Sequence, residues 1–521
     1  MMLIVEMLLL GALLVSGFLW LRQKDKKQYR IGASLAIFTV VFAIILMACD
    51  IWQAILALCV AVLLCLAYLV RRTPLSNWPL RITGLFFAML FALAVLPLYL
   101  FPIPSLPKPT GSWHVGTQEF EMVDTSRDGA MYDDPQTPRR LFVRVWYPTD
   151  AASGKRRPYL TKREADVTIV SVGNHFGVGS QYGLGNYVYK PLRHIKAHAF
   201  ENAEVSQTDD MFPTLIFSHG YLSWVGQNTA LMELLASHGY IIYSVSHPYD
   251  GADIPFADGS VIKTQITERV GYTDNMVGFL TGETHEDRLA FFDSFKTDFD
   301  QYRIRKSVEP WGEDVAFLTN TLAQNRTPDS MRAVAAKTDM SKFGMIGMSF
   351  GGSNVAYECH KDVRCKAAVN LDGEEFVWEL YDTDIRMPFL MIHGDWWKYG
   401  FWIVPKTPDF HINDYAYERW ETTGERDDVY RIRVKGLQHL GFMDFPITLR
   451  MPLRDKAYGS QNGKKALAAV NETVLAFLDK HVKGDPTNFP ADVLSQHPAL
   501  DLHDPRGVSR WWRARDSENG E

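Results

Sequence analysis

Four long apolar segments in the first hundred residues constrain the fold of this chain more than any other feature. A transmembrane helix needs about 20 consecutive apolar residues, and each segment is close to that length. The sequence therefore predicts four membrane-spanning helices within residues 1–101. The segments run over Leu3–Leu21, Ile31–Cys49, Ile51–Val70 and Ile82–Phe101.

Basic residues between these segments predict their orientation, because Lys and Arg in short loops stay on the cytoplasmic side. These residues lie in the loop after the first segment and in the loop after the third. Both loops would then be cytoplasmic, and the N-terminus and everything after Phe101 would lie outside the cytoplasmic (inner) membrane. The first segment contains Glu6 and is followed, not preceded, by positive charge, so we interpret it as a retained helix rather than a cleaved signal peptide. The basic residues are Arg22, Lys24, Lys26, Lys27, Arg30, Arg71, Arg72 and Arg81.

A proline-rich stretch separates the apolar part from the rest of the chain. Residues 102–113 contain Pro102, Pro104, Pro107 and Pro109, and proline at this density favours an extended linker. We therefore expect a globular domain over residues 114–485 and a C-terminal tail over residues 486–521. The net charge of −6 is small for 521 residues and does not point to nucleic acid as a partner.

The pattern after the linker is typical of an α/β fold. Two segments alternate as half-buried strands do, and six later apolar runs suit strands that are buried on both faces. Helical patterns lie between most of these runs, which predicts a mostly parallel sheet with helices on both faces, in the α/β-hydrolase layout. The predicted strands are Val115–Val123, Leu141–Trp146, Thr214–Phe217, Tyr240–Val245, Phe343–Ile346, Lys366–Leu371, Pro388–Ile392 and Tyr430–Val434.

Three connections are too long to be simple turns between these elements. They run over Asn174–Asp210, Asp250–Ile304 and Asp395–Asp428. Long insertions in compact domains commonly carry functional structure. We therefore expect them to form a cap or the walls of a pocket.

The strongest local motif is Gly347-Met348-Ser349-Phe350-Gly351, followed by Gly352. It lies between a predicted strand and a predicted helix, where a G-x-S-x-G sequence exposes a nucleophilic serine on a sharp turn. The helix N-terminus would also place N–H groups near a developing oxyanion. We predict that Ser349 is a nucleophile.

A serine needs a base and an acid that orients the base, and on this fold they follow the serine in the order acid, histidine. His439 is the histidine that comes just after the last predicted strand. Asp372 and Asp395 each end a strand between Ser349 and His439, and spacing alone slightly favours Asp395.

The second half of the oxyanion hole is expected in the loop after the first parallel strand. That loop reads Phe217-Ser218-His219-Gly220-Tyr221. We predict the backbone N–H groups of Tyr221 and Phe350 as oxyanion donors. His219 is expected to brace the loop by hydrogen bonding rather than to act as a base.

The globular domain resembles the plasma-type platelet-activating-factor acetylhydrolases, also called lipoprotein-associated phospholipases, from about Gly111 to Lys480. The resemblance does not cover the apolar segments. It rests on Phe217-Ser218-His219-Gly220, Leu235-Ala236-Ser237-His238-Gly239-Tyr240, Gly347-Met348-Ser349-Phe350-Gly351-Gly352, Leu371-Asp372-Gly373, and His439 with Phe442, Asp444 and Phe445.

The resemblance implies that Asp372 is the acid and that the substrate is a short or oxidised acyl ester, often on a phospholipid, hydrolysed without calcium. Met348 departs from the histidine that often precedes the serine. Two alternatives remain: a broad carboxylesterase for small or polymeric esters outside the cell, and a non-catalytic membrane sensor on the same fold. The expected partners are thus a lipid or small ester substrate and the membrane.

Other residue patterns suggest packing rather than further chemistry. No spacing favours a metal site and no glycine-rich loop favours a phosphate, so we expect no cofactor. Cys359 and Cys365 could form a disulfide outside the cytoplasm if their Cα atoms are close enough. An aromatic group near the strand ends is expected to line an acyl pocket: Trp224, Trp378, Trp396, Trp397, Phe401 and Trp402.

Overall fold

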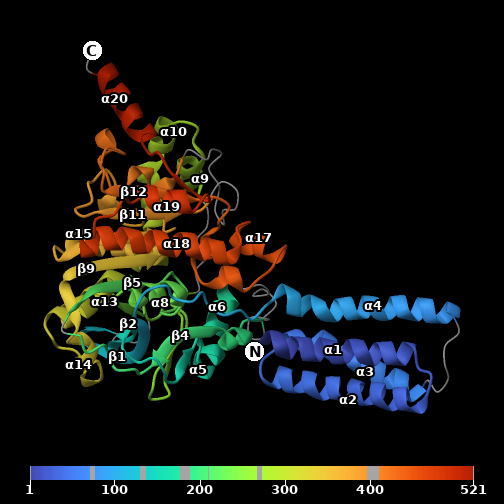
Figure 1. The fold of residues 1–521 in the computed structure, drawn as a ribbon. Coiled ribbons are helices and arrows are strands. Elements are labelled where there is room, and N and C mark those ends of the chain that lie inside the picture. The colour runs from blue at the N-terminus through green and yellow to red at the C-terminus, as the bar shows by residue number, and fades with distance from the viewer. Residues whose placement is uncertain are drawn as a thin grey trace.

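The computed structural model describes residues 2–70, 77–128, 137–176, 188–208, 210–266, 273–395 and 410–519. It has two parts, a bundle of four long helices and an α/β domain from which the bundle projects (Figure 1). Residues Trp396, Trp397, Phe401 and Trp402 of the predicted aromatic group, and the basic residues Arg71 and Arg72, lie outside the described residues.

The four predicted apolar helices are present, and each is long and apolar enough to cross a membrane. Large apolar side chains cover the outside of the bundle, such as Leu85 and Ile37, whereas small ones such as Ala43 and Ala57 are fully buried inside it. Small residues at the helix contacts are typical of helix packing in lipid. The elements are α1 (Met2–Leu21), α2 (Lys26–Ala48), η1 (Trp52–Ala54), α3 (Ile55–Val70) and α4 (Asn77–Leu100).

The turn between α2 and α3 contacts the α/β domain. Asp50 forms an ion pair of 3.0 Å with Arg193, and the neighbouring His194 donates from Nε2 to the Cys49 carbonyl at 2.7 Å. The loop between α1 and α2, which holds the first group of basic residues, lies at the opposite end of the bundle (Figure 1). The bundle is thus polarised, with positive charge at the end that is remote from the domain.

An eleven-stranded sheet forms the centre of the α/β domain, in the order β13-β12-β11-β10-β9-β5-β6-β2-β1-β4-β3. Strands β6, β5, β9, β10, β11 and β12 are parallel, and β2 and β13 pair antiparallel at their two ends. The strands are β1 (His114–Asp128), β2 (Pro138–Thr149), β3 (Arg156–Pro158), β4 (Lys196–Glu201), β5 (Phe212–Ser218), β6 (Ile241–Val245), β9 (Thr338–Met348), β10 (Cys365–Leu371), β11 (Phe389–His393), β12 (Val429–Val434) and β13 (Leu500–Leu502), and a separate pair is β7 (Ile254–Pro255) with β8 (Val261–Ile262).

The predicted two antiparallel and six parallel strands are confirmed. Three short strands of this sheet, β3, β4 and β13, and the separate pair β7 and β8 were not predicted. Of these, β4 lies in a segment expected to be an insertion and β13 in the expected tail, and both join the sheet. Neither β4 nor β13 has the continuous apolar run by which the buried central strands are recognised in the sequence, and pairing at the sheet decides their structure.

Helices cover both faces of the sheet, and alternate residues of the strands face the two layers. In β5, Leu215 and Phe217 pack in the core under α8 and α18, whereas Ile216 packs in the core under α13 and α15. The helices are α5 (Lys162–Asp166), α6 (Thr168–Phe176), α8 (Thr229–Ser237), α9 (Asp274–Thr281), α10 (His285–Ala290), α11 (Phe292–Phe299), α12 (Arg303–Lys306), α13 (Val308–Ala323), α14 (Arg332–Ala335), α15 (Phe350–Lys361), α17 (Leu453–Tyr458), α18 (Gly463–Leu478), α19 (Ala491–Gln496) and α20 (Gly507–Asn519).

Short helical turns and insertions pack beside the ends of the strands. Within the second insertion, Phe292 and Phe295 pack around Phe279, with ring centroids 5.4 and 5.0 Å from it. The C-terminal α20 also packs there, with the Trp512 ring 5.5 Å from Trp420. The short turns are η3 (Lys190–His194), η4 (Asp329–Met331), η5 (Trp378–Leu380), η6 (Ile412–Tyr415), η7 (Trp420–Thr422), η8 (His439–Phe442), η9 (Phe445–Ile447) and η10 (Asp479–Lys483).

Candidate active site

Ser349 occupies the sharp turn between β9 and α15. Its backbone has φ 56° and ψ −128°, a conformation that is unfavourable for a residue with a side chain and that commonly marks a functional site. Its amide donates to the Leu371 carbonyl at 2.8 Å, which ties the turn to β10. The turn therefore holds Ser349 in a fixed position above the centre of the sheet.

Glycine is required beside this serine because backbone segments meet there. A Cβ on Gly347 would lie 2.0 Å from the Gly351 carbonyl oxygen, and one on Gly351 would lie 2.3 Å from the Ser218 carbonyl oxygen. Distances below 3.0 Å are not found for real Cβ atoms. The two glycines of the motif thus allow β9, α15 and β5 to approach each other.

His439 and Asp372 complete a hydrogen-bonded series with Ser349. The Ser349 hydroxyl lies 2.9 Å from His439 Nε2, and His439 Nδ1 lies 2.7 Å from Asp372 Oδ2. Asp372 is buried, and its other oxygen accepts from the Gly394 amide at 2.7 Å. An imidazole that donates from Nδ1 to a carboxylate presents Nε2 as an acceptor for a hydroxyl proton.

The other candidate acid, Asp395, is directed elsewhere. Its Oδ2 accepts from the Gly436 amide at 2.5 Å, and its Oδ1 lies 4.0 Å from Arg433 Nε. These bonds brace the turn that follows β12. Of the two carboxylates, Asp372 is therefore the one that forms a hydrogen bond with His439 in the folded chain.

The other histidines that follow Ser349 make different contacts. His503 bonds to Asp414 and His497 to Glu472. His360 bonds to Arg386, and His393 bonds to the Gly394 carbonyl. His411 bonds to Asn413, and His481 bonds to Tyr430.

The loop after β5 passes directly against Ser349. A Cβ on Gly220 would lie 3.3 Å from Ser349 Cβ. His219 is buried beside it: its Nε2 accepts from the His247 amide at 3.3 Å, so its Nδ1 carries the proton and donates to the Gly220 carbonyl at 2.8 Å. Burial, together with the neighbouring His247, lowers the pKa of His219 to about 3. His219 is therefore neutral at physiological pH and holds the Gly220 carbonyl.

A second hydroxyl–imidazole–carboxylate series lies beneath this loop, and the sequence reasoning missed it. Ser218 Oγ lies 2.9 Å from His247 Nε2, and His247 Nδ1 lies 3.0 Å from Asp314 Oδ2. All three residues are fully buried. Although burial opposes it, the Arg139 guanidinium holds the pKa of Asp314 well below its ordinary value. Because solvent does not reach this series, we interpret it as a brace for the loop.

Two further carboxyl groups, also missed from the sequence, follow Asp372. Burial raises the pKa of Glu374 to about 7, and the nearby Asp372 adds to the effect while His439 opposes it. Burial raises the pKa of Glu375 to about 8, although Glu375 accepts from the Ser353 hydroxyl at 2.7 Å and from the Val377 amide. Near neutral pH, Glu375 is therefore largely protonated, whereas Glu374 is about half protonated.

Cys359 and Cys365 form a disulfide between the end of α15 and the start of β10, with their Cα atoms 5.3 Å apart. The bond joins the helix after Ser349 to the strand that leads to Asp372. Within the part of the chain that the structure describes, no group of three or more His, Cys, Asp or Glu side chains is arranged to hold a metal ion.

The fold is also that of known esterases. A solved structure of a ferulic acid esterase from Streptomyces cinnamoneus matches with a TM-score of 0.56 and 22% sequence identity, over 77% of this chain and 99% of that chain. With the sheet order and the Ser349 turn, this likeness defines the class of the protein, an α/β-hydrolase.

The family is given by the sequence comparisons. The model of the family described as platelet-activating factor acetylhydrolase, isoform II, matches residues 101–287 and 314–497. Platelet-activating factor acetylhydrolases from Cavia porcellus and Bos taurus are 23% and 22% identical, over 74% and 72% of this chain and 79% and 77% of the relatives. A probable 1-alkyl-2-acetylglycerophosphocholine esterase from Arthroderma benhamiae is 25% identical over 52% of this chain and 60% of its own length. The chain belongs to the platelet-activating factor acetylhydrolase isoform II family and is an ester hydrolase.

The raised pKa of Glu375 predicts that the protein loses stability as the pH rises. An unfolded glutamate ionises near pH 4.3, whereas the folded carboxyl keeps its proton until about pH 8. Between these values the unfolded state binds fewer protons than the folded state, so the free energy of unfolding falls as pH increases. We expect Glu375→Gln, which keeps an acceptor for Ser353, to reduce the fall in unfolding temperature between pH 5.5 and 8.5.

The measurement is thermal unfolding of the full-length protein in detergent at several pH values. Glu379→Gln is the matched control, because Glu379 is exposed in the same segment. Parallel curves for wild type and Glu375→Gln would contradict the prediction.

Proposed function

We propose that the chain is a membrane-anchored serine esterase that hydrolyses short or oxidised acyl esters of phospholipids with Ser349, His439 and Asp372. The observation that carries the proposal is the hydrogen-bonded series from Ser349 through His439 to Asp372 on a strained strand-to-helix turn. Membership of a family whose relatives are named as acetylhydrolases supports this class of ester.

The geometry suits acyl transfer through a covalent intermediate. His439 Nε2 takes the proton of Ser349 as its Oγ attacks the ester carbonyl, and it then returns the proton to the leaving alcohol. Water, activated by the same imidazole, hydrolyses the acyl-enzyme and releases the acid. Asp372 holds the imidazole in the tautomer that presents Nε2 to Ser349 and stabilises the imidazolium that forms.

We assign the oxyanion hole to the backbone N–H groups of Tyr221 and Phe350. Phe350 is the first residue of α15, so its N–H belongs to the group at a helix N-terminus that has no partner within the helix. The N–H of Tyr221 belongs to the same peptide group as the Gly220 carbonyl, and the two point in opposite directions in a trans peptide. His219 accordingly acts as a positioning residue. Its hydrogen bond holds the Gly220 carbonyl, so the N–H of Tyr221 in the same peptide group points away from His219.

The four apolar helices are proposed to span the cytoplasmic membrane with the α/β domain on the extracytoplasmic side. The position of the first basic loop, at the end of the bundle remote from the domain, supports this orientation. The disulfide between Cys359 and Cys365 supports an oxidising surrounding for the domain. This arrangement would keep the site close to lipid.

Substrate preference tests the proposed function. The full-length protein in detergent would be compared with Ser349→Ala on 1-alkyl-2-acetyl and 1-alkyl-2-palmitoyl glycerophosphocholines and on aryl acetates and palmitates. We expect preferential release of acetate from the phospholipid, with a loss of about three orders of magnitude or more in the variant.

Other outcomes would change the assignment. Turnover of aryl esters alone would favour the broad carboxylesterase. Equal rates for wild type and Ser349→Ala would remove Ser349 from the mechanism, and failure of a serine-directed phosphonate to label the protein would favour the non-catalytic sensor.

The assignment of the acid predicts different results for two similar substitutions. Asp372→Asn removes the carboxylate that fixes the His439 tautomer, so we expect kcat to fall about a thousandfold or more. Asp395→Asn alters a brace of the turn after β12, so its effect on kcat should be below about tenfold. Steady-state kinetics with the two variants decide the matter, and a greater loss in Asp395→Asn would reverse the assignment.

The proposed role of His219 predicts a loss of kcat without a change in substrate binding. His219→Ala leaves the Gly220 carbonyl without its donor, so the N–H of Tyr221 is no longer directed, and kcat should fall about tenfold to a hundredfold while KM changes little. The pH profile should keep its shape, because the pKa of His219, about 3, lies below the working range. His360→Ala, at the end of α15, is the control, and a changed KM with normal kcat would refute this role.

A further inference from the structure

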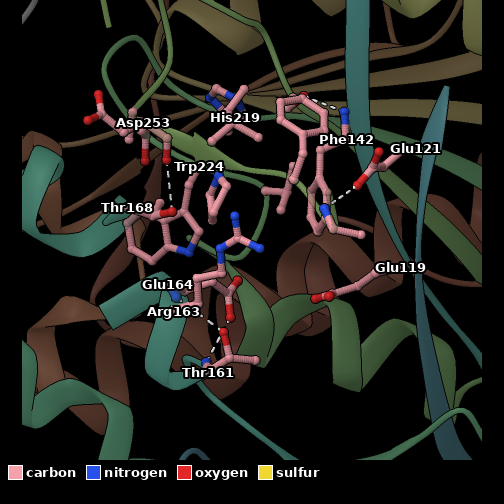
Figure 2. Close-up of a pocket in the computed structure, with 18 of the residues that line it drawn as sticks. Glu119, Glu121, Phe142, Thr161, Arg163, Glu164, Thr168, His219, Trp224 and Asp253 are labelled. Atoms are coloured by element: carbon pink, nitrogen blue, oxygen red, sulfur yellow. Dashed lines mark hydrogen bonds between the residues drawn. The ribbon is translucent and has the colours of Figure 1, made fainter. Parts of the chain in front are cut away.

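A separate cavity of about 480 Å³ is lined in part by His219 and Trp224, which belong to the end of β5 and the loop that follows it (Figure 2). Gly220, at the start of this loop, lies against Ser349, whereas Ser223, Trp224 and Val225, further along it, line the cavity. The series of Ser349, His439 and Asp372 does not contribute to its described lining. Its volume is within the range of small-molecule binding sites, roughly 300–1,000 Å³.

Most of the wall of this cavity is apolar. The apolar side chains come from β2, from the loop after β5 and from the segment around β7. An aryl or alkyl group could therefore be buried there with a favourable transfer from water. These side chains include Phe142, Val225, Ala252, Ile254, Pro255 and Phe256, and Phe120 of β1 lines the cavity as well.

Buried hydrogen-bond donors are concentrated at one part of the wall. Trp224 Nε1 and Ser223 Oγ have no hydrogen-bond partner among the described residues, although the two side chains are only 4% and 5% exposed. Nη1 of the fully buried Arg144, which is not among the residues that line the cavity, is also without a partner in the described chain. A Cβ on Gly226 would lie 2.6 Å from this Nη1 and 2.8 Å from Trp224 Nε1, so the two donors are neighbours. Buried donors are nearly always satisfied by an acceptor.

The carboxylates around the cavity are already engaged. Glu119 and Glu164 each pair with both Arg144 and Arg157. Glu121 pairs with Arg140. The remaining lining carboxylate, that of Asp253, accepts from the Ser171 hydroxyl and the Thr264 amide.

Arg163 adds a positive charge with no such partner. Its guanidinium points into the cavity (Figure 2), and among the described residues it forms a hydrogen bond with the Ser260 carbonyl but no ion pair. The cavity therefore combines a largely apolar wall with the donors of Trp224 and Ser223 and the guanidinium of Arg163.

We propose that this cavity binds a small carboxylic acid with an apolar body, with the carboxylate on Trp224, Ser223 and Arg163 and the body against the apolar wall. Acids of this class are the products of ester hydrolysis, and that link rests on the proposed function. The binding itself does not require Ser349 to react. A bound acid would contact the same loop that carries Tyr221.

Direct binding of a soluble acid tests the proposal. Isothermal titration calorimetry with the full-length protein in detergent would compare 3-phenylpropanoate with 3-phenylpropanol and 3-phenylpropylammonium. We expect the acid to bind more tightly than the alcohol and the ammonium analogue not to bind. Equal binding of the acid and the ammonium ion, or no binding of the acid, would overturn the proposal.

Variants locate the bound acid. Trp224→Phe keeps the shape of the wall but removes one donor, so the affinity should fall about tenfold. Ala252→Leu fills the space and should abolish binding, and Arg163→Gln should also weaken it. Trp113→Phe is the matched control, because Trp113 packs against Phe212 outside the lining.

Equal affinities in Trp224→Phe, Ala252→Leu and Trp113→Phe would place the acid elsewhere and overturn the proposal. Ester hydrolysis measured on the same samples separates the two claims. If the wild type binds the acid but does not hydrolyse esters, the proposed function is refuted and the binding site is supported. If it hydrolyses esters but does not bind the acid, the binding site is refuted and the proposed function is supported.

Discussion

The backbone conformation of Ser349 is the constraint on which the arrangement of the site depends. A positive φ costs about 1–3 kcal/mol for a residue with a side chain, so it persists only where the surroundings impose it. Here the central strand β9 and the buried helix α15 impose it, and the glycines on either side allow them to meet. The same packing brings the ends of β10 and β12 close to the serine, and these ends carry Asp372 and lead to His439.

Two series of the same residue types have different accessibility in this domain. The Ser349 series is reachable because the His439 side chain is 21% exposed, whereas Ser218, His247 and Asp314 are fully buried. In the buried series the charge of Asp314 is balanced by Arg139 and Arg127, as a charge in the interior requires. Solvent access, rather than residue type, therefore separates a candidate site from a brace.

The helix bundle and the α/β domain meet at a polar contact. Asp50 and Arg193 pair where the α2–α3 turn reaches the domain, and the outer surface of the bundle carries the apolar side chains that lipid would cover. A domain held in this way would meet substrates at a membrane surface. The loop after β5 contacts Ser349 through Gly220 and lines the separate cavity through Trp224.

Periodicity and local motifs are sufficient to predict the four apolar helices, the α/β class, the eight main strands and the family from the amino-acid sequence. The placement of Ser349 on a strand-to-helix turn was also readable locally. The catalytic roles of Ser349, Asp372 and His439 stay predictions, although the fold brings these three side chains together.

Features that depend on contacts between distant segments become visible only in the folded chain. Spacing slightly favoured Asp395, yet the ends of the strands direct that carboxylate to Gly436 and place Asp372 on His439. The short strands β4 and β13 form because a sheet edge is available to them. The buried Ser218–His247–Asp314 series and the donors around Trp224 join residues tens to nearly a hundred positions apart. No local pattern records such contacts, because hydrogen bonding and burial are set by the folded chain.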